Sequence, residues 1–212
     1  MKENINLNKF IKDLNLKKIF KELYPICRSI TGKGFEQSLN ILNSVSKLNK
    51  KKVRSGTKVL DWIIPEEWNI EDAYVKENGK KIINFKKHNL HIVNYSKKID
   101  KIVSYNELIK HLHYLPKIPN AIPYVHSYYE KYWGFCLKYS QFKKINKKGK
   151  FKVKIDSSFK KGNLIYSDNL IPGKSKDEIL IYTYLCHPQM ANHELSGPLA
   201  WLTLYEIIKN TK

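Results

Sequence analysis

The stretch YTYLCHPQMANHELSG, residues 182–197, decides how the C-terminal part of this chain should fold. A nearly continuous apolar run over 178–185 predicts a strand that is buried on both faces and ends near His187. Pro188 takes the chain out of that strand, and a polar loop leads to a helix that opens at Ser196-Gly197. Because an open parallel sheet binds ligands at the carboxyl ends of its strands, we expect a functional site at His187.

Three side chains of this stretch are candidate metal ligands: His187, His193 and Glu194. Imidazole nitrogens and carboxylate oxygens are typical ligands of catalytic zinc, and a strand end would hold them rigidly. The spacing alone leaves a second interpretation open, in which His187 only caps the strand through a hydrogen bond. Ser196 and Gly197 are small enough to let the following helix pack close to the strand.

The rest of the chain divides into three stretches of different character. Apolar residues at helical spacing predict one or two helices over 7–23 and another over 35–48. A β-rich region follows, and after a lysine-rich linker at 143–150 the pattern becomes α/β. We therefore expect an α/β core formed by 1–53 and 147–212, with 54–146 as a separate β-rich domain.

Short β-branched and aromatic runs place the expected strands, and turn residues separate them. We expect strands at 57–64, 72–76, 81–85, 90–95, 151–155 and 163–167. Asn78-Gly79 is a strong signal for a hairpin turn. Ser104 with Glu107 forms a capping box that predicts a short helix to about Tyr114. The residues from Tyr128 predict a helix before a strand near Trp133, and 199–208 predict a helix.

The net charge of +20 raises the question of nucleic-acid binding, but the kind of basic residue argues against it. All but two of the 39 basic residues are lysines, and the exceptions are Arg28 and Arg54. Proteins that read nucleic acids rely on arginine for bidentate contacts. We expect mostly solvated surface lysines, with a functional anion-binding patch as the alternative, and no nucleic-acid partner.

Several features of the composition favour a soluble, cytoplasmic protein. No apolar run reaches the roughly 18 residues that a membrane span needs, and the N-terminus lacks the apolar core of a secretory signal. Cys27, Cys136 and Cys186 are widely spaced and form no disulfide framework. Cys186 should point to the opposite face of the strand from His187 and serve as a small core residue.

The other five histidines are expected to lie on the surface or to pack against neighbours. They are His88, His91, His111, His113 and His126. His111 and His113 are two residues apart on an expected helix, where they face different directions and cannot chelate one metal.

Four stretches of the chain resemble a bacterial family of aminopeptidase-like proteins. They are LYPICRSITGKG (23–34), SGTKVLDWIIPEEWNIEDAY (55–74), LPKIPNAIPYVHSYYEKYWGFCLKY (115–139) and CHPQMANHELSG (186–197). The family is related to the co-catalytic dizinc aminopeptidases and is often labelled as polysaccharide biosynthesis proteins, and this chain resembles its N-terminal half. The resemblance implies a zinc-aminopeptidase-like three-layer α/β core, incomplete here, with an inserted small β-rich domain.

The resemblance also implies roles for the candidate site. His187 stands where the family has a zinc-ligand histidine, and His193 stands where the family has an aspartate that bridges two metals. A neutral imidazole cannot offer an oxygen to each of two metals, so His193 departs from the family pattern. Glu194 is a substitute carboxylate, and a single zinc held by His187 and His193 is the other arrangement. One or two zinc ions are thus the expected cofactor.

The implied function is the N-terminal portion of a zinc-dependent hydrolase of the aminopeptidase type, acting on a peptide or small molecule. We expect it to be inactive alone, because the general base and further ligands would follow residue 212; the only later candidate, Glu206, sits inside a helix. The strand at 178–185 also needs parallel neighbours, which a missing C-terminal half or a second copy would supply. The alternative is a non-catalytic binding or structural module linked to surface polysaccharide biosynthesis, with 124–139 lining its surface.

Overall fold

The computed structural model describes residues 14–210, which form two compact units of mixed α and β structure. Unit 1 contains the chain up to Arg54 and again from Asn163, and unit 2 contains 55–162. The helix predicted around 7–11 lies outside the described residues.

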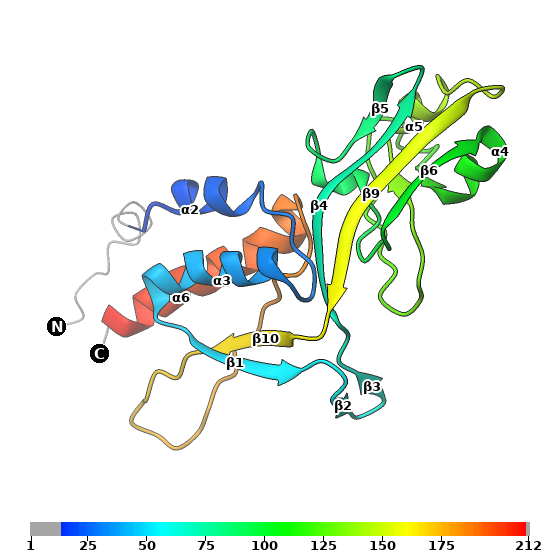
Figure 1. Ribbon diagram of the computed structural model, residues 1–212. Helices are drawn as coiled ribbons and strands as arrows, with labels where there is room; N and C mark the ends of the chain where they lie inside the picture. Colours follow the sequence, from blue (N-terminus) through cyan, green and yellow to red (C-terminus); the bar gives the residue numbers. More distant parts are fainter. Residues whose placement is uncertain (1–13, 211–212) are drawn as a thin grey trace. The chain divides into compact units, whose positions relative to one another are not determined.

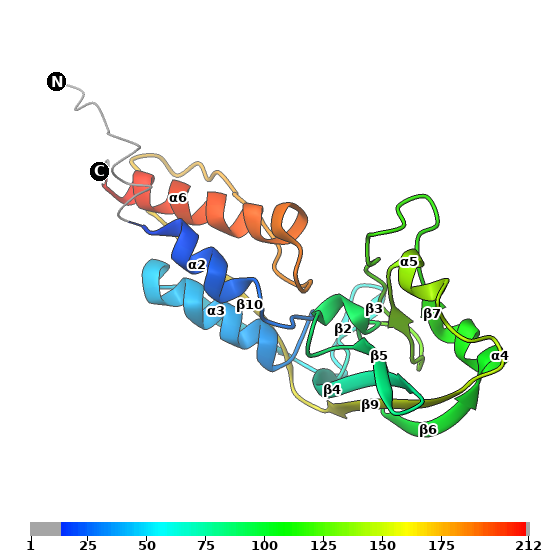
Figure 2. The ribbon, with the colours of Figure 1, turned by 90° about the horizontal axis from the view of Figure 1, so that it is seen from above.

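The described residues of unit 1 form three α-helices, a π-helical turn and a two-stranded ribbon. The helices are α2 (Leu16–Leu23), α3 (Lys33–Ser46) and α6 (Ser196–Asn210). Figures 1 and 2 show them side by side, and α3 contacts both other helices. Asn15 caps α2, since its Oδ1 accepts from the Lys18 N–H at 3.2 Å. The predicted helices at 35–48 and 199–208 are therefore confirmed, with small shifts of their ends.

The ribbon of unit 1 pairs strand β1 (Asn49–Arg54) with β10 (Asn163–Asp168) in antiparallel register. Arg54 lies opposite Asn163, so the two ends of unit 2 emerge from neighbouring positions of the ribbon. α3 packs on β10. The core between helices and ribbon consists of Ile19, Leu23, Ile26, Leu39, Leu42, Ile165, Leu185, Leu195 and Leu202.

The prediction of a buried strand over 178–185 is wrong. In the described part of the chain this segment pairs with no strand, and Figure 1 draws it as plain coil between β10 and α6. Ile179, Leu180 and Tyr182 are largely exposed, and only Leu185 is buried. A strand that is buried on both faces needs other strands beside it and helices on both faces of the sheet. The described residues of unit 1 form only a two-stranded sheet, and the segment 178–185 does not join it.

Unit 2 is organised around a four-stranded antiparallel sheet with the strand order β5-β4-β9-β6. The strands are β4 (Glu67–Glu77), β5 (Lys80–Asn84), β6 (Ile99–Ser104) and β9 (Lys150–Lys160), and Figure 1 shows β4 and β9 as the long central pair. Asn78 and Gly79, with φ values of 47° and 77°, form the β4–β5 turn. Two positive φ angles define the predicted hairpin turn, which is confirmed.

Short elements complete unit 2. They are β2 (Lys58–Val59), β3 (Trp62–Ile63), η1 (Asn89–His91), α4 (Tyr105–Leu108), η2 (Ile109–His111), β7 (Leu112–His113), β8 (Phe135–Cys136) and α5 (Tyr139–Phe142). The Ser104 hydroxyl accepts from the Glu107 N–H at 3.3 Å, which confirms the predicted helix start. The helix is shorter than predicted because Leu112 already pairs with Phe135. The helix predicted from Tyr128 does not form.

The second boundary between the units differs from the one that the sequence suggests. Residues 150–160 were assigned to the α/β core, but β9 pairs with β4 along nearly its whole length and with β6 along half of it. This pairing joins β9 to the β-rich unit, which ends at Gly162. The Ser55 N–H donates to the Gly162 carbonyl at 2.9 Å and closes the base of unit 2. None of the helices in the described residues has the length and apolar character to cross a bilayer.

Replacing Gly34 by alanine should destabilise unit 1. An added Cβ would lie 1.9 Å from the Cys27 carbonyl oxygen, so the backbone would have to move. Such overpacking costs about 1–3 kcal/mol, more than the roughly 1 kcal/mol that alanine gains over glycine in a helix. We expect a net decrease in the free energy of unfolding, measured by urea denaturation. Gly173→Ala is the control, because its Cβ would meet nothing within 4 Å; an unchanged stability of Gly34→Ala would contradict the expectation.

Candidate metal centre

A π-helical turn, η3 (Ala191–Leu195), leads directly into α6 and carries two of the three candidate ligands. Such turns hold an extra residue and are frequent at functional sites. The start of α6 packs closely on the preceding segment, since a Cβ at Gly197 would lie 2.3 Å from the Thr183 hydroxyl. The close approach predicted for Ser196-Gly197 is therefore confirmed.

Glu194 is fully buried and accepts three hydrogen bonds. Its Oε1 accepts from the backbone N–H of His187 at 2.7 Å and from that of Cys186. Its Oε2 lies 2.7 Å from Nδ1 of His187. One carboxylate thus fixes both the backbone and the side chain at the predicted site.

His187 has a largely buried side chain, 16% exposed, whose ring orientation is set by Glu194. Because a carboxylate oxygen accepts, Nδ1 carries the proton in the hydrogen bond to Oε2, so a metal would be bound through Nε2. A carboxylate that orients a histidine in this way is the usual outer partner of a metal ligand.

His193 is exposed, and its ring centroid lies 5.3 Å from that of His187. The Tyr184 hydroxyl lies 3.4 Å from its Nδ1. The structure therefore places His193 beside His187, and Glu194 is hydrogen-bonded to His187 from the buried side. Two imidazoles whose ring centroids lie 5.3 Å apart could hold a borderline-soft divalent ion such as zinc.

Arg28 is a buried cation next to this site and is not among the predicted site residues. Its side chain is fully buried, and it donates to the carbonyls of His187 at 3.1 Å and Leu23 at 2.5 Å. Burial lowers the pKa of the guanidinium to about 10, and the charge of Glu194 opposes that shift. The group therefore stays charged at neutral pH and ties the end of α2 to the His187 loop.

The prediction that Cys186 points away from His187 and serves as a small core residue is wrong, and its side chain is only half-buried. Its side chain does not point away from His187, because no strand forms there; Sγ lies 3.6 Å from His187 Nδ1. Cys186, His187 and Glu194 offer ligand atoms within 4.8 Å of one another. Burial, and next the charge of Glu194, raise the pKa of the thiol to about 12, so it is a neutral thiol and no nucleophile at pH 7.

Two contributors, Arg28 and Tyr184, were missed by sequence reasoning. A signal existed for the first, because Arg28 is one of only two arginines in a chain that otherwise uses lysine. A buried guanidinium can serve several carbonyls from one fixed plane, which an ammonium cannot. No comparable signal marked Tyr184 among the 14 tyrosines of the chain.

The histidines of unit 2 pack against neighbours, as predicted. Nδ1 of His91 lies 2.7 Å from the Cys136 carbonyl, and His111 stacks on Trp133 with centroids 3.6 Å apart. Burial lowers the pKa of both rings, and of His88 and His113. The contacts of His91 and His111 and the lowered pKa of both rings indicate that these histidines serve to pack unit 2.

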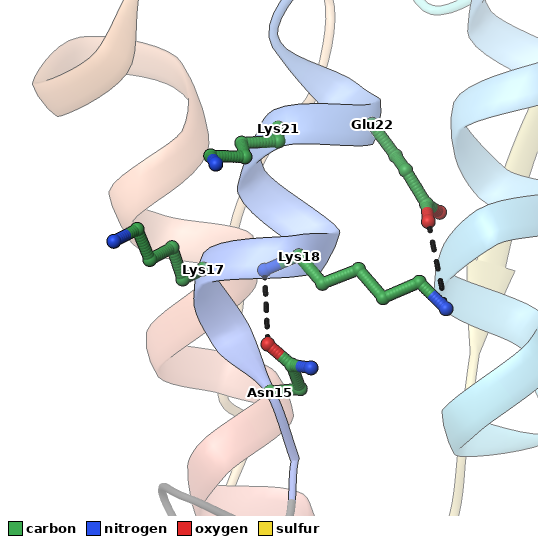
Figure 3. A pocket seen from close by; sticks show the side chains of 5 residues that line it. All are labelled: Asn15, Lys17, Lys18, Lys21 and Glu22. Atoms are coloured by element: carbon green, nitrogen blue, oxygen red, sulfur yellow. Dashed lines mark hydrogen bonds and ion pairs between the residues drawn. The ribbon is translucent and has the colours of Figure 1, made fainter.

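A pocket along helix α2 lies apart from these candidate ligands. It is lined by Asn15, Lys17, Lys18, Lys21 and Glu22. Figure 3 shows Lys17 and Lys21 extending to one side of the helix and Lys18 to the other, where it lies 4.0 Å from Glu22 in an exposed ion pair. Scattered lysine ends of this kind do not form a converging set of ligand groups, so the pocket supplies no second site.

A comparison with domain families matches unit 2. Residues 67–158 match the family described as "Domain of unknown function (DUF2172)". The matched region begins and ends within the two central strands, β4 and β9, of the four-stranded sheet. The candidate ligands lie outside it.

Two relatives from Clostridium acetobutylicum match nearly the whole chain. A curated protein named "Putative polysaccharide biosynthesis protein with aminopeptidase-like domain" is 42% identical over 197 residues, which are 90% of this chain and 45% of that protein. A solved structure, titled as that of a "putative peptidase", is 40% identical with a TM-score of 0.90 over 96% of this chain and 50% of its own. The chain thus resembles the N-terminal half of an aminopeptidase-like protein and spans about half the length of the relatives it matches.

Replacing Glu194 should destabilise unit 1 in proportion to the acceptors that are lost. Glu194→Gln keeps one oxygen for the two backbone donors but turns an amide NH₂ toward His187, which costs about 1–3 kcal/mol. Glu194→Ala leaves all three donors without this acceptor and should cost more. Urea denaturation measures both, with the exposed Glu178→Gln as the matched control. Equal stabilities of Glu194→Gln and the control would contradict the role of this carboxylate.

The three thiols should react slowly in the folded protein. Burial raises the pKa of Cys27, Cys136 and Cys186 each to about 12, so their thiolate fraction at pH 8 is on the order of 10³ below that of an ordinary cysteine. Since the pKa is raised, reactivity should increase steadily from pH 7 to pH 10. Timed labelling with a chromogenic disulfide measures this, and the urea-unfolded chain is the control. Rapid labelling of a folded thiol at pH 7 would show that its environment is wrongly described.

Proposed function

We propose that this chain, which resembles the N-terminal half of an aminopeptidase-like protein, provides the first metal ligands of a zinc-dependent hydrolase. The observation that carries the proposal is the fixed imidazole of His187, which Glu194 orients from a fully buried position. An exposed protein surface does not need such an arrangement, and a metal ligand does.

The donor set fits a single zinc better than a pair. His187 and His193 would each offer one nitrogen from rings 5.3 Å apart. Glu194, predicted as a third ligand, already accepts hydrogen bonds on both oxygens, which favours an orienting role. A bridging oxygen for a second metal would have to come from another group, since an imidazole has none.

Zinc bound there would supply Lewis-acid polarisation of a substrate carbonyl. The residues of this chain would then do the positioning. Glu194 would hold the His187 proton at Nδ1, and Arg28 would fix the loop through the His187 carbonyl. The exposed His193 would face the substrate side, with the Tyr184 hydroxyl next to it.

Hydrolysis would need groups beyond those of this chain. Glu206 is the one later carboxylate that was considered as a base, but it lies ten positions after Ser196 along α6, a rise of about 15 Å. It also lies 3.7 Å from Lys209 in an ion pair. We therefore propose that a general base and further ligands come from the equivalent of the relatives' second half, and that the substrate is a peptide or small molecule.

A second candidate is a binding or structural module of polysaccharide biosynthesis, the role named for the curated relative. The observation that favours it is the complete set of partners that Glu194 finds within the chain. In this alternative the Arg28–Glu194 network serves stability alone. Metal binding distinguishes the two candidates.

Zinc titration of the metal-free chain tests the proposal. We expect binding of one zinc in a buffer without chelating groups, measured by calorimetry and by elemental analysis of the dialysed protein. His193→Ala should abolish stoichiometric binding because one of two imidazoles is lost. Glu194→Gln should weaken zinc binding about 10–100-fold, as is typical for a lost orienting partner.

His126→Ala is the matched control, because His126 is also an exposed histidine and lies in unit 2. It should leave zinc affinity unchanged. Absence of zinc from the unmodified chain, or equal losses in His193→Ala and His126→Ala, would favour the structural module.

A further inference from the structure

The segment 179–184 combines two properties that rarely occur together in a folded protein. It is apolar and aromatic in sequence, Ile-Leu-Ile-Tyr-Thr-Tyr, and five of its six side chains are exposed. Leu180 is 89% exposed and Tyr182 is 79% exposed. A contiguous apolar surface of this kind marks an interaction site.

The segment is nevertheless held firmly at its C-terminal end. Leu185 is part of the unit 1 core, and the next two backbone N–H groups donate to Glu194. Thr183 lies against Gly197 at the start of α6. The position of the segment is therefore fixed by the fold of unit 1, while its outer side chains remain uncovered.

Helix α6 also carries exposed apolar side chains. Leu202 packs into the core, whereas Leu204 and Ile208 are exposed. A helix that is apolar on more than one face is usually covered on more than one face. The neighbouring segment and helix thus both present apolar side chains that unit 1 does not bury.

The two relatives indicate what covers this surface. The solved structure matches 96% of this chain with a TM-score of 0.90, but the match takes up only half of that protein. The backbone of this chain therefore closely resembles that of the matching half of a protein that is about twice as long. The apolar, β-branched and aromatic composition of 179–184 is that of a strand with neighbours on both sides.

We propose that 179–184 is a docking strand for a polypeptide equivalent to the second half of the C. acetobutylicum relatives. That polypeptide adds strands to the segment through main-chain hydrogen bonds and covers Leu180, Tyr182 and the exposed side of α6. Strand addition of this kind takes its affinity from backbone groups and its specificity from alternate side chains. The proposal does not depend on metal binding, so the two can fail separately.

Co-expression tests the proposal. The full 212-residue chain, carrying an affinity tag, is produced together with the second half of the C. acetobutylicum protein. We expect a 1:1 complex by size-exclusion chromatography with light scattering. In hydrogen exchange, the amides of 179–184 should be slowed at least tenfold in the complex relative to the chain alone.

Variants with matched controls identify the surface. The double variant Leu180→Lys with Tyr182→Lys should lose at least nine-tenths of the recovered complex. Leu60→Lys with Tyr129→Lys is the control, because these unit 2 side chains are 89% and 80% exposed and should retain the complex. Because all four side chains are largely exposed, none of these changes disturbs the core.

Leu180→Pro separates strand pairing from simple apolar contact. No hydrogen bond within the described chain uses the Leu180 N–H, so proline should leave the isolated chain folded and still prevent the added ladder. Failure to recover the second half, full retention of the complex by either Leu180 variant, or loss in the unit 2 control would overturn the proposal. The proposal would also be overturned if the chain alone formed a homodimer that Leu180→Lys with Tyr182→Lys dissociates.

Discussion

The organisation of unit 1 depends on two opposite charges that are both removed from water, Arg28 and Glu194. Each alone would be costly to bury, and the energetic effect of a buried charge depends on how completely its hydrogen bonds are made. Glu194 collects two backbone N–H groups and an imidazole, and Arg28 collects the carbonyls of Leu23 and His187. Between them they join the end of α2, the His187 loop and the turn before α6, so the geometry of the candidate site is a property of the core.

The same network explains how the candidate site differs from the pattern of the aminopeptidase-like family. A carboxylate at the position of His193 would supply an oxygen on the exposed side, and the imidazole supplies a single nitrogen instead. Glu194 does not restore the missing oxygen because it is buried and both of its oxygens already accept hydrogen bonds. In the zinc site that we propose, His187 and His193 would hold one ion, and a second ion would need ligands from elsewhere.

The sequence predicted local structure well and burial less well. The β4–β5 turn, the cap at Ser104 and the helices of unit 1 follow from residues close in sequence, and the structure confirms them. The grouping of His187, His193 and Glu194 was also predictable, because they are only seven residues apart. The conformation and exposure of 178–185 could not be predicted in this way. An apolar run suggests a buried strand, but a strand is buried only where other strands and helices pack against it. Arg28 was missed because the partner that links it to the candidate site, the His187 carbonyl, lies 159 residues away along the chain.

The register of the ribbon in unit 1 has a consequence for the order of folding. Arg54 lies opposite Asn163, so the whole of unit 2 forms the connection between the two strands of one hairpin. An unfolded connection of that length would make closing the hairpin entropically costly and slow. Once unit 2 has folded, with Ser55 bonded to Gly162, its two ends are already adjacent and the connection behaves like a tight turn. A folded unit 2 would therefore lower the entropic cost of closing the β1–β10 ribbon, which is the reason to expect the β-rich sheet to form before the ribbon.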